Sequence, residues 1–537
     1  MRYLRALQAD RSLRRASTVR GLVVLRAATA PERPAFIEGA SGRTVAWEDV
    51  RRAAAEWTAR RRALAPSSRA AVGILIADPL AAATAYLAAL ASGVGIAPLD
   101  PHAPASQSAR EVVTLQLSAV VTDTTDPATI DALTGAGADV WRLDDDGPTP
   151  LVGRAGPAPR PLPDRAAVIL ASSGTTGPRK VIPLTERQLL RSAAATVSHH
   201  QLDADDRGYC PLPLFHVNAI VVGVLSNLVA GSSLVLDTRF SRRRFWSVVE
   251  RYNVTWLNLV PAMIGILSES TAPSPDVQQR VRFARSASAP LAATVSARFE
   301  AHCGITVLET YGMTEAAAQI TANPIDPARR RRGSVGQPVA TEVRVVTGGP
   351  GNAGRRVLGR GGVGDIEIRG DSVVARYWVS TAGGLVARSA VSAGRWLATG
   401  DVGWLDDDDF LHLVGRSDDV INRAGEKIYP GEIEDVLLGD PRVTGAAAVG
   451  RPHPIVGEEP VAFVTTDVPS ASRAELTRDL GSSCEQALSR FKRPVHITVA
   501  EALPSGPTGK VRRRDLRRLV AAAAAPASVP TQPPEER

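Results

Sequence analysis

The 537-residue chain contains few cysteines, few aromatic residues and almost no lysine. Its three cysteines are isolated in the sequence and lack the paired spacing of a metal site. They predict a reducing, cytoplasmic environment instead of a disulfide framework. No segment reaches the roughly 18 uninterrupted apolar residues that indicate a membrane-spanning helix, and the N-terminus lacks the apolar core of a secretory signal. We therefore predict a cytoplasmic globular protein without a membrane span.

A large excess of one charge is also lacking. The chain has 63 basic and 55 acidic residues, which gives a formal net charge of +8. The arginines form only short runs and no dense basic tract. This balance predicts mild attraction for anionic ligands and no nucleic-acid partner.

Lysine is the most informative shortage. Lysine occurs only at positions 180, 427, 492 and 510, and the other basic residues are arginine. In such a chain a lysine indicates a place that needs a compact ammonium, because a planar guanidinium is not equivalent. Lys180 and Lys510 each lie in a glycine-rich loop, "SSGTTGPRK" and "PSGPTGKV". Two lysines in two such loops favour phosphate binding over chance survival.

The pattern of apolar segments predicts an α/β fold. Helical and strand-like segments alternate from residue 31 to about 335, which predicts parallel sheets covered by helices. We expect a large N-terminal domain, residues 1–416, with two helix-covered sheets and a β-rich subdomain at about 335–416. A small α+β C-terminal domain follows at 417–520. The Ala/Pro-rich tail, 521–537, is predicted to be disordered.

The segment "SSGTTGPRK" follows an apolar run that is typical of a buried strand. Small hydroxyl residues, glycines and one lysine predict a phosphate cradle of inward N–H groups, donor hydroxyls and a neutralising ammonium. The alternative from the residues alone is an ordinary strand-to-helix turn.

Two further segments carry side chains suited to a nucleotide. In "LETYGMTEAA", Tyr311 offers a ring for a base, and Glu315 offers one carboxylate, which suffices for Mg²⁺ beside a polyphosphate. The alternative for Glu315 is the acidic first turn of a helix. Asp401, after a glycine turn, could accept hydrogen bonds from a ribose diol.

These segments, taken together, resemble the motif series of the adenylate-forming superfamily. In order they are "SSGTTGPRK", "PLFHVNA", "ETYGMTE", "GDIEIRG", "WLATGDVG", "GRSDDVINRAGEKIYPGEIE" and "PSGPTGKV". The resemblance extends from about residue 30 to 518 and implies a mobile C-terminal domain. Its "AGEKIYPGEIE" segment is similar to that of acyl-CoA synthetases. The resemblance therefore implies ATP-dependent activation of a carboxylic acid as an acyl-adenylate, followed by thioesterification to coenzyme A.

The resemblance also implies a nucleotide site. It assigns the β- and γ-phosphates of ATP to Ser173, Gly174, Thr175, Thr176, Gly177 and Lys180. It assigns the adenine pocket to Ser288, Ala289 and Pro290 on one side, and to Tyr311, Gly312 and Met313 on the other.

Five residues are implied to act around the reacting atoms. Thr314 would contact the α-phosphate, and Glu315 would hold Mg²⁺. Asp401 would bind the ribose hydroxyls of ATP and AMP with help from Arg416, and Lys510 would bridge the incoming carboxylate and the α-phosphate.

The second half-reaction is implied to use another face of the C-terminal domain. Rotation about the hinge residue Asp418 would remove the Lys510 loop and bring in Ala424 and Gly425. The pantetheine thiol of coenzyme A would then enter and displace AMP. Whether the acceptor is free coenzyme A or a carrier protein stays open, as does the oligomeric state.

The acyl pocket is implied to lie around His216, Asn218, Arg285 and Ser286, with His216 similar to the gating histidine of the family. "FHVN" lacks the aspartate that binds an α-amino group, which argues against an amino-acid substrate. Arg285 could pair with a second carboxylate, as in small diacid ligases, or lie outside the pocket. Otherwise an apolar pocket would take an aliphatic, aromatic or polycyclic acid.

The phosphate loop departs from the family pattern. Proline is displaced by one position and valine follows the lysine, so the loop reads Gly177-Pro178-Arg179-Lys180-Val181, and Glu186 stands where histidine is common. A carboxylate that pointed toward the triphosphate would repel it, whereas one on an outward helix face would be harmless. Proline also removes an N–H donor.

Three hypotheses follow. The chain is a complete acyl-CoA ligase, or it forms thioesters from an acyl-adenylate that a partner ligase supplies, or it is a non-catalytic adenylate-binding protein. Glu315 and Lys510 argue against the second hypothesis. Lys510, Asp418 and Gly425 argue against the third, because a binding protein needs no second face.

Overall fold

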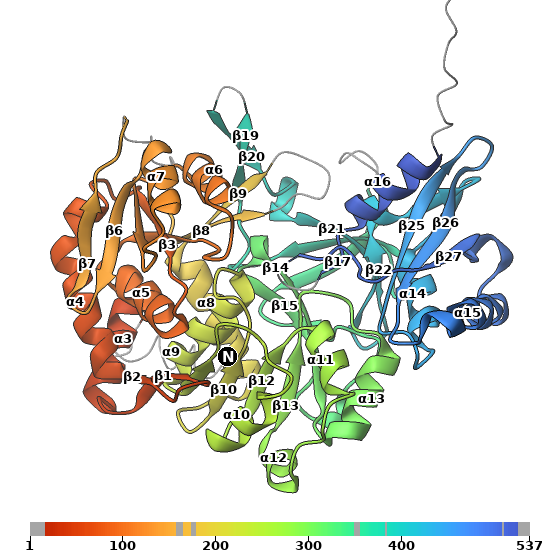
Figure 1. The fold of residues 1–537 in the computed structure, drawn as a ribbon, viewed down its shortest axis with the longest axis horizontal. Helices are drawn as coiled ribbons and strands as arrows, with labels where there is room; N and C mark the ends of the chain where they lie inside the picture. Colours follow the sequence, from red (N-terminus) through yellow and green to blue (C-terminus); the bar gives the residue numbers. More distant parts are fainter. Residues whose placement is uncertain are drawn as a thin grey trace, which may run out of the picture. The chain divides into compact units, whose positions relative to one another are not determined.

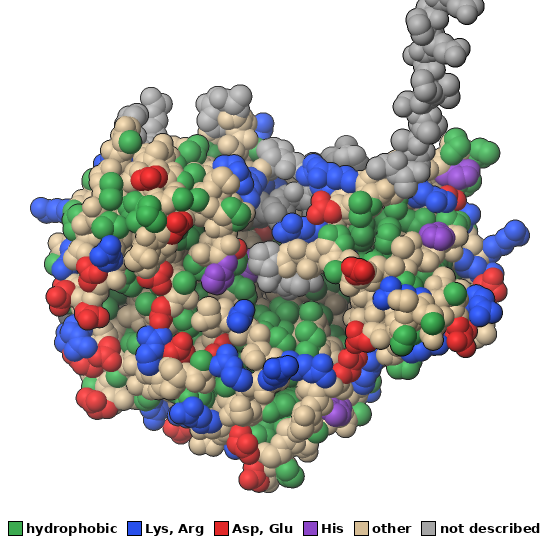
Figure 2. Space-filling view, in the orientation of Figure 1, with side chains coloured by type: hydrophobic (Ala, Val, Ile, Leu, Met, Phe, Trp, Pro, Cys, Tyr) green, Lys and Arg blue, Asp and Glu red, His purple; other side chains and the backbone are tan. Residues whose placement is uncertain are grey.

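A computed structural model describes residues 17–156, 165–172, 179–347, 355–381, 384–506 and 510–524 (Figure 1). The chain divides into two compact units: residues 1–399 with 403–413, and residues 400–402 with 414–537. The fold is α/β, as predicted. Within the described ranges, no helix is long and apolar enough to cross a membrane. On the face shown in Figure 2, basic and acidic side chains are interspersed, in keeping with the small net charge.

The first unit contains two large sheets. One has the spatial order β20 (Gly384–Ser389), β19 (Arg376–Thr381), β9 (Lys180–Leu184), β8 (Val168–Ser172), β4 (Gly95–Pro98), β3 (Ala71–Leu75), β5 (Ala119–Thr122), β6 (Asp139–Asp144) and β7 (Gly147–Val152). Strands β8, β4, β3, β5 and β6 are parallel neighbours. The side chains of β8, β4, β3 and β5 are almost all apolar, as is typical of strands that are buried on both faces. Strand β6, by contrast, contains Asp139, Arg142 and Asp144.

Helices cover both faces of this sheet. Helices α4 (Trp47–Leu64) and α5 (Pro79–Ser92) pack together, and α6 (Ala105–Leu115) packs on α7 (Pro127–Gly135) (Figure 1). Helix α5 is apolar on nearly every side and most of its residues are buried. It begins where the Asp78 side chain accepts a hydrogen bond from Ala81 N, and it ends at Gly93 in the left-handed conformation.

The second large sheet has the order β16 (Gln337–Pro338), β15 (Ala318–Ala322), β14 (Val307–Met313), β13 (Phe283–Ser286), β12 (Trp256–Leu259), β10 (Arg207–Cys210), β11 (Ser233–Leu236), β1 (Pro34–Glu38) and β2 (Thr44–Ala46). Strands β14, β13, β12, β10, β11 and β1 are parallel neighbours, so their carboxyl ends meet at one edge.

Helices and a smaller sheet complete the first unit. The helices include α3 (Val19–Thr29), α8 (Glu186–His200), the π-helix η1 (Ala219–Leu225), α9 (Ser226–Ala230), α10 (Phe245–Arg251), α11 (Pro261–Leu267), α12 (Pro275–Arg280) and α13 (Ala293–Cys303). The smaller sheet has the order β17 (Glu342–Val346), β18 (Gly364–Arg369), β21 (Leu397–Leu405) and β22 (Leu411–Arg416). Part of β21 and the end of β22 belong to the second unit.

The second unit is a small α+β body. Its sheet has the order β24 (Glu426–Ile428), β23 (Ile421–Arg423), β26 (Gly457–Thr465) and β25 (Gly445–His453), with β27 (His496–Val499) paired to β26. The helices are α14 (Pro430–Leu438), α15 (Arg473–Ala487) and α16 (Arg513–Ala524). Helix α16 continues through residues 521–524, which the sequence had assigned to a disordered tail. Leu516 and Val520 of α16 are buried in a cluster with residues of β25 and β26, and the following alanines favour helix.

Candidate active site

Part of the predicted phosphate loop, from Ser173 to Pro178, lies outside the described residues. Its flanks are the antiparallel strands β8 and β9, with Ser172 opposite Lys180. The alternative of a strand-to-helix turn is therefore wrong. The Lys180 ammonium lies 4.8 Å from the centroid of the Tyr377 ring, and the Arg179 guanidinium lies 3.7 Å from the Glu111 carboxylate on α6.

Glu186, one of the departures from the family pattern, is engaged elsewhere. It is the first residue of α8, and its Oε1 accepts a hydrogen bond of 2.7 Å from the backbone N–H of Val19. Val19 begins helix α3. A carboxylate at a helix N-terminus is stabilising, because the helix dipole is positive there. The negative charge of Glu186 thus acts on α3, which agrees with the harmless alternative.

The ends of β13 and β14 bring the two predicted adenine segments to one edge of the second sheet. The two strands are parallel neighbours, and Thr310 Oγ1 donates a hydrogen bond of 3.0 Å to the carbonyl of Ser286. Ser288, Ala289 and Pro290 follow β13 at this edge, and Tyr311 lies in β14. A Cβ at position 312 would lie 1.7 Å from the Ala318 carbonyl oxygen, so only glycine fits this approach of β14 and β15.

Thr314 and Glu315 lie in a single 3₁₀ turn directly after Met313. The Glu315 side chain is 9% exposed and has no hydrogen-bond or ion-pair partner among the described residues. In the same ranges, no group of three or more potential protein ligands surrounds a common point. A single unpaired carboxylate fits Mg²⁺, which takes most of its oxygens from phosphate and water when it binds a nucleotide.

The predicted ribose and carboxylate-bridging residues lie in the second unit. Arg416 Nη1 donates a hydrogen bond of 3.2 Å to Asp401 Oδ1. Burial lowers the pKa of Lys510, and the charge of Arg416 lowers it further, while Asp401 and Asp419 act in the opposite direction. Arg416, Asp401 and Lys510 are therefore electrostatically coupled.

The predicted hinge residue Asp418 lies in a 3₁₀ turn, Ser417–Asp419. Arg517 of α16 donates hydrogen bonds to the Asp418 carbonyl, at 3.1 Å, and to Asp419 Oδ1, at 2.7 Å. On the predicted coenzyme A face, Ala424 and Gly425 both have positive φ, 52° and 89°. A Cβ on Gly425 would meet no atom within 4 Å, so this glycine is favoured by its backbone conformation and not by lack of space.

Arg285 is a buried cation surrounded by neutral amides. It lies on β13 and is 2% exposed. Its Nη1 donates to Asn218 Oδ1 at 2.9 Å and to Asn258 Oδ1 at 3.0 Å, and Nη2 donates to Gln319 Oε1 at 3.4 Å. Among the described residues, no carboxylate contacts this guanidinium. Burial lowers the pKa of Arg285 to about 9, so the side chain stays charged at pH 7.

Three buried polar atoms of this hydrogen-bonded group have no partner among the described residues: Nδ2 of Asn218, Nε of Arg285 and Nε2 of Gln319. Nε2 of His216 and Oγ of Ser286, which lie close to Asn218 and Arg285 in the sequence, are also buried without a partner. Each unsatisfied buried group costs roughly 1–3 kcal/mol. The three amide oxygens face the guanidinium. The amide nitrogen of Asn258 donates to Cys210 Sγ and Asn218 Oδ1, both at 3.5 Å, whereas those of Asn218 and Gln319 are left as unpaired donors. An acceptor-rich ligand is the chemistry that would satisfy this set.

His216 and Asn218 begin the segment that leads into η1. Burial lowers the pKa of His216 to about 4, so its imidazole is neutral at pH 7. Asn218 directly precedes the π-helix, a rare form that is frequent at functional sites. Asn258 and Gln319 escaped the sequence analysis. Asn258 is a polar residue within the apolar run "VTWLNLV", which was the available signal.

Comparison with known proteins identifies the class of protein that carries this fold and site. The family model described as "AMP-binding enzyme" matches residues 24–378, and "AMP-binding enzyme C-terminal domain" matches residues 432–510. The chain belongs to this family of adenylate-forming enzymes.

Three similar proteins refine this. A sulfoacetate–CoA ligase of Cupriavidus necator is 35% identical over 507 residues, covering 93% of this chain and 97% of the relative. An oxalate–CoA ligase of Arabidopsis thaliana is 36% identical over 356 residues, covering 66% and 67%. The crystal structure of ATP-bound MatB from Rhodopseudomonas palustris superimposes with a TM-score of 0.79 at 25% identity and covers 94% of this chain and 99% of that one.

The chain is thus an ATP-dependent, AMP-forming acyl-CoA ligase, with a carboxylic acid, ATP and coenzyme A as its substrates. The hypothesis that it takes a preformed acyl-adenylate from a partner ligase is not favoured, because the relatives are named as CoA ligases.

Proposed function

We propose that the acid activated by this ligase is small and carries a second anionic group, a carboxylate or a sulfonate, which binds Arg285. The observation that supports this most directly is the buried guanidinium without a carboxylate partner among the described residues. Burying a charge is costly unless an opposite charge and hydrogen bonds compensate it. A second anionic group would supply both.

The unpaired donors around Arg285 support the same proposal. A carboxylate or sulfonate brings several acceptor oxygens, which could take hydrogen bonds from Arg285 Nε, Asn218 Nδ2 and Gln319 Nε2. An apolar tail would leave these donors unpaired and would therefore bind poorly. The names of the two relatives with 35% and 36% identity described above point the same way, since sulfoacetate and oxalate are both dianionic acids.

Arg285 also needs acceptors that hold it without neutralising it. Asn258 is its direct neighbour across strands β12 and β13. Asn258, Asn218 and Gln319 offer amide oxygens, which orient the guanidinium but keep its full charge for the substrate. In this proposal Arg285 binds the substrate and Asn258 is a positioning residue.

We propose the following roles for the remaining site residues. The substrate carboxylate attacks the α-phosphorus of ATP, a P–O bond forms and pyrophosphate leaves. Thr314 and Lys510 stabilise the charge that builds on the α-phosphate. Glu315 would hold Mg²⁺, which supplies further positive charge to the phosphates when bound. The thiol sulfur of coenzyme A then attacks the acyl carbon, and AMP leaves with the C–O bond electrons.

We also propose a cytoplasmic location, supported by Cys210, Cys303 and Cys484, which are all buried free thiols. No partner ligase is needed in this scheme.

The test of the proposed substrate class is a panel of acids offered with ATP, Mg²⁺ and coenzyme A, with the CoA thioesters quantified by mass spectrometry. Sulfoacetate, oxalate and related dianions are compared with monoanions of matched size, such as propionate and butyrate. We expect kcat/KM to be at least about 100-fold higher for the preferred dianion. Equal or faster turnover of a monoanion would exclude the second anionic group.

The proposed role of Lys510 is tested separately with the Lys510→Met variant. We expect loss of pyrophosphate release from ATP, with conversion of a preformed acyl-adenylate and coenzyme A to thioester retained. Loss of both half-reactions in a folded variant would contradict a role confined to adenylation.

A further inference from the structure

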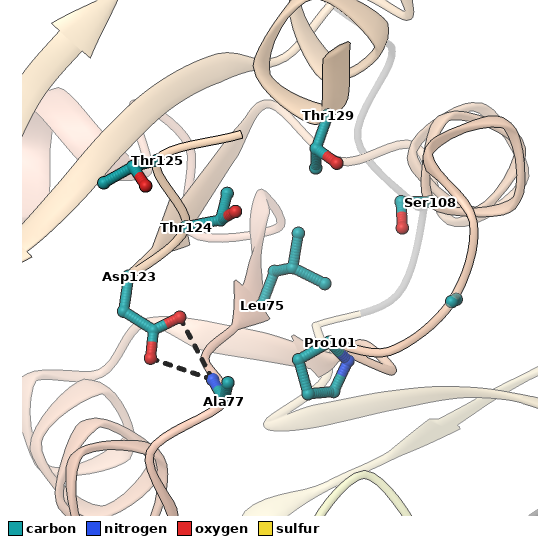
Figure 3. A pocket seen from close by; sticks show the side chains of 9 residues that line it. Leu75, Ala77, Pro101, Ser108, Asp123, Thr124, Thr125 and Thr129 are labelled. Carbon is teal, nitrogen blue, oxygen red and sulfur yellow. Dashed lines mark hydrogen bonds between the residues drawn. The ribbon is translucent and has the colours of Figure 1, made fainter. Parts of the chain in front are cut away.

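A cavity in the first unit is lined by none of the site residues predicted from the sequence. It has a volume of about 290 Å³ and lies at the carboxyl ends of β4, β3 and β5 (Figure 3). Leu75 and Ala77 come from the end of β3, Pro101 from the loop after β4, and Asp123 and Thr124 from the loop after β5. Ser108 on α6 and Thr129 on α7 form the opposite wall.

The topology of the sheet explains why a cavity forms here. The chain leaves β3 through α5 and returns on one side, as β4, whereas it leaves β5 through α7 and continues on the other side, as β6. Right-handed crossovers in opposite directions lie on opposite faces of a sheet. Helices α5 and α7 therefore diverge between β3 and β5. In open α/β sheets, ligands bind in the crevice at such a switch point.

The cavity is lined by a fixed carboxylate. Asp123 Oδ1 accepts a hydrogen bond of 3.1 Å from Ala77 N, and Oδ2 accepts bonds of 2.9 Å from Ala77 N and 3.1 Å from Asp78 N. These N–H donors orient the carboxylate and offset part of its charge. A carboxylate has about four acceptor positions, so capacity for a ligand hydroxyl is left.

Hydroxyl groups complete the polar lining. Ser108 is 2% exposed, and its hydroxyl has no hydrogen-bond partner among the described residues. Thr124, Thr125 and Thr129 add three further hydroxyls (Figure 3). Leu75 and Pro101 form an apolar floor between them.

This lining excludes several ligand classes. Among the described residues, no lysine or arginine lines the cavity, so an anion would meet Asp123 without compensation. Asp123 is also the only described lining residue of a metal-ligating type, which is too few for a metal held by protein side chains. An apolar ligand would leave Ser108 and Asp123 without partners. A neutral ligand with several hydroxyl groups satisfies both the carboxylate and the hydroxyls.

We propose that this cavity is a binding site for a vicinal diol of pentose size, such as a ribose unit or a related polyol. Its volume corresponds to roughly ten water molecules at about 30 Å³ each, and a pentose has about ten non-hydrogen atoms. Asp123 accepts hydrogen bonds from the diol, Ser108 and Thr125 bind further hydroxyls, and Leu75 and Pro101 contact the carbon face of the sugar. This site is independent of the proposed acyl specificity.

The test measures binding to the full-length enzyme with saturating AMP, so that the nucleotide site is occupied. Methyl β-D-ribofuranoside is titrated by ligand-observed NMR against its 2-deoxy analogue, which has no vicinal diol. We expect saturable binding in the millimolar range and at least about 5-fold weaker binding of the 2-deoxy analogue. Equal binding of the two glycosides, or no saturable binding up to 50 mM, would overturn the proposal.

Matched variants locate the site. Ser108→Val fills the cavity and removes its buried hydroxyl, and we expect at least 10-fold weaker binding. Ser106→Val, on the exposed side of the same helix, is the control and should bind as the parent does. If Ser108→Val does not fold, Thr125→Val carries the test, because Thr125 is exposed and the change is isosteric; we expect about 3-fold weaker binding. Unchanged affinity in a folded Ser108→Val or Thr125→Val variant would contradict the site.

Discussion

The two large sheets of the first unit both place polar side chains near the carboxyl ends of parallel strands, but with opposite chemistry. Near the end of β13, a buried cation is surrounded by amides, and no carboxylate contacts it among the described residues. At the ends of β3 and β5, a carboxylate is surrounded by hydroxyls, and no cation among the described residues lines the cavity. The same architecture thus supports two polar sites, and their side chains decide which ligand each one suits.

The largest effect is expected from Arg285→Met, which removes the buried cation from the proposed acyl site. Breaking a buried, hydrogen-bonded charge pair costs about 3–5 kcal/mol. We therefore expect kcat/KM for the dianionic acid to fall roughly 1000-fold, measured by thioester formation, while kcat/KM for a matched monoanion stays within a few-fold.

Arg282→Met is the matched control for that variant. Arg282 lies one residue before β13 and already pairs with Asp206 at 2.8 Å. Its loss should leave the ratio between dianion and monoanion unchanged. A similar loss for both acids in Arg285→Met would show that Arg285 is structural.

We expect acid to lower the free energy of unfolding through three buried histidines of the first unit. Burial lowers the pKa of His216 and of His199 to about 4, and that of His200 further. Below about pH 6.5 the unfolded chain binds protons that the folded chain does not, so stability falls as the pH falls from 6.5 toward 4.

His216 alone should cost about 2 kcal/mol of unfolding free energy between pH 7 and pH 5. Urea unfolding at the two pH values measures this, and His216→Gln should flatten the dependence by that amount. An equal slope in the variant would contradict burial of the neutral imidazole. No histidine is among the described residues that line the cavity between β3 and β5, so we expect no such contribution from them.

Asn258→Asp sharpens the comparison, because it gives Arg285 an internal counter-ion. The new carboxylate would lie beside Arg285 Nη1, where Asn258 Oδ1 now accepts a bond of 3.0 Å. We expect KM for the dianion to rise roughly 10-fold because the cation is then neutralised. Asn258→Ala removes the acceptor without adding charge and should raise KM less. An equal effect of both variants would argue against neutralisation as the cause.

The smallest effect is expected from Asp123→Ala in the cavity between β3 and β5. It removes the acceptor of the Ala77 and Asp78 N–H groups at the start of α5. Water can replace it because Asp123 is exposed, so we expect a loss of only about 1 kcal/mol in unfolding free energy. Chemical denaturation measures it, and CoA ligase activity should be unchanged. A loss of several kcal/mol would assign Asp123 a structural role.

The sequence predicted the α/β class and the alternation of helical and strand-like segments up to about residue 335, because apolar runs before glycine-rich or polar segments are local signals. It left the position of Arg285 open. The partners of Arg285 lie on β12, β15 and before η1, and the register between strands that brings Asn258 beside Arg285 is not encoded in any single segment. The cavity between β3 and β5 also escaped prediction, because it depends on strand order.

The end of α16 was predicted wrongly and the role of Glu186 was left open between two alternatives, for related reasons. Helix α16 continues into the alanines because Leu516 and Val520 pack on β25 and β26 of the second unit. Glu186 could be understood only once α3, more than 150 residues earlier in the chain, was seen to begin at its carboxylate.

The π-helix after Asn218 changes how the proposed acyl site responds to chain length. A π-turn contains one more residue than an α-turn over the same rise. Removing one residue from Ala219–Leu225 would therefore let the segment rewind as α-helix with Asn218 in the same orientation relative to α9. In an ordinary α-helix, the same deletion would turn the preceding residues by about 100°. A single-codon deletion in this segment is thus a change that the scaffold can accept while the Asn218 amide stays beside Arg285.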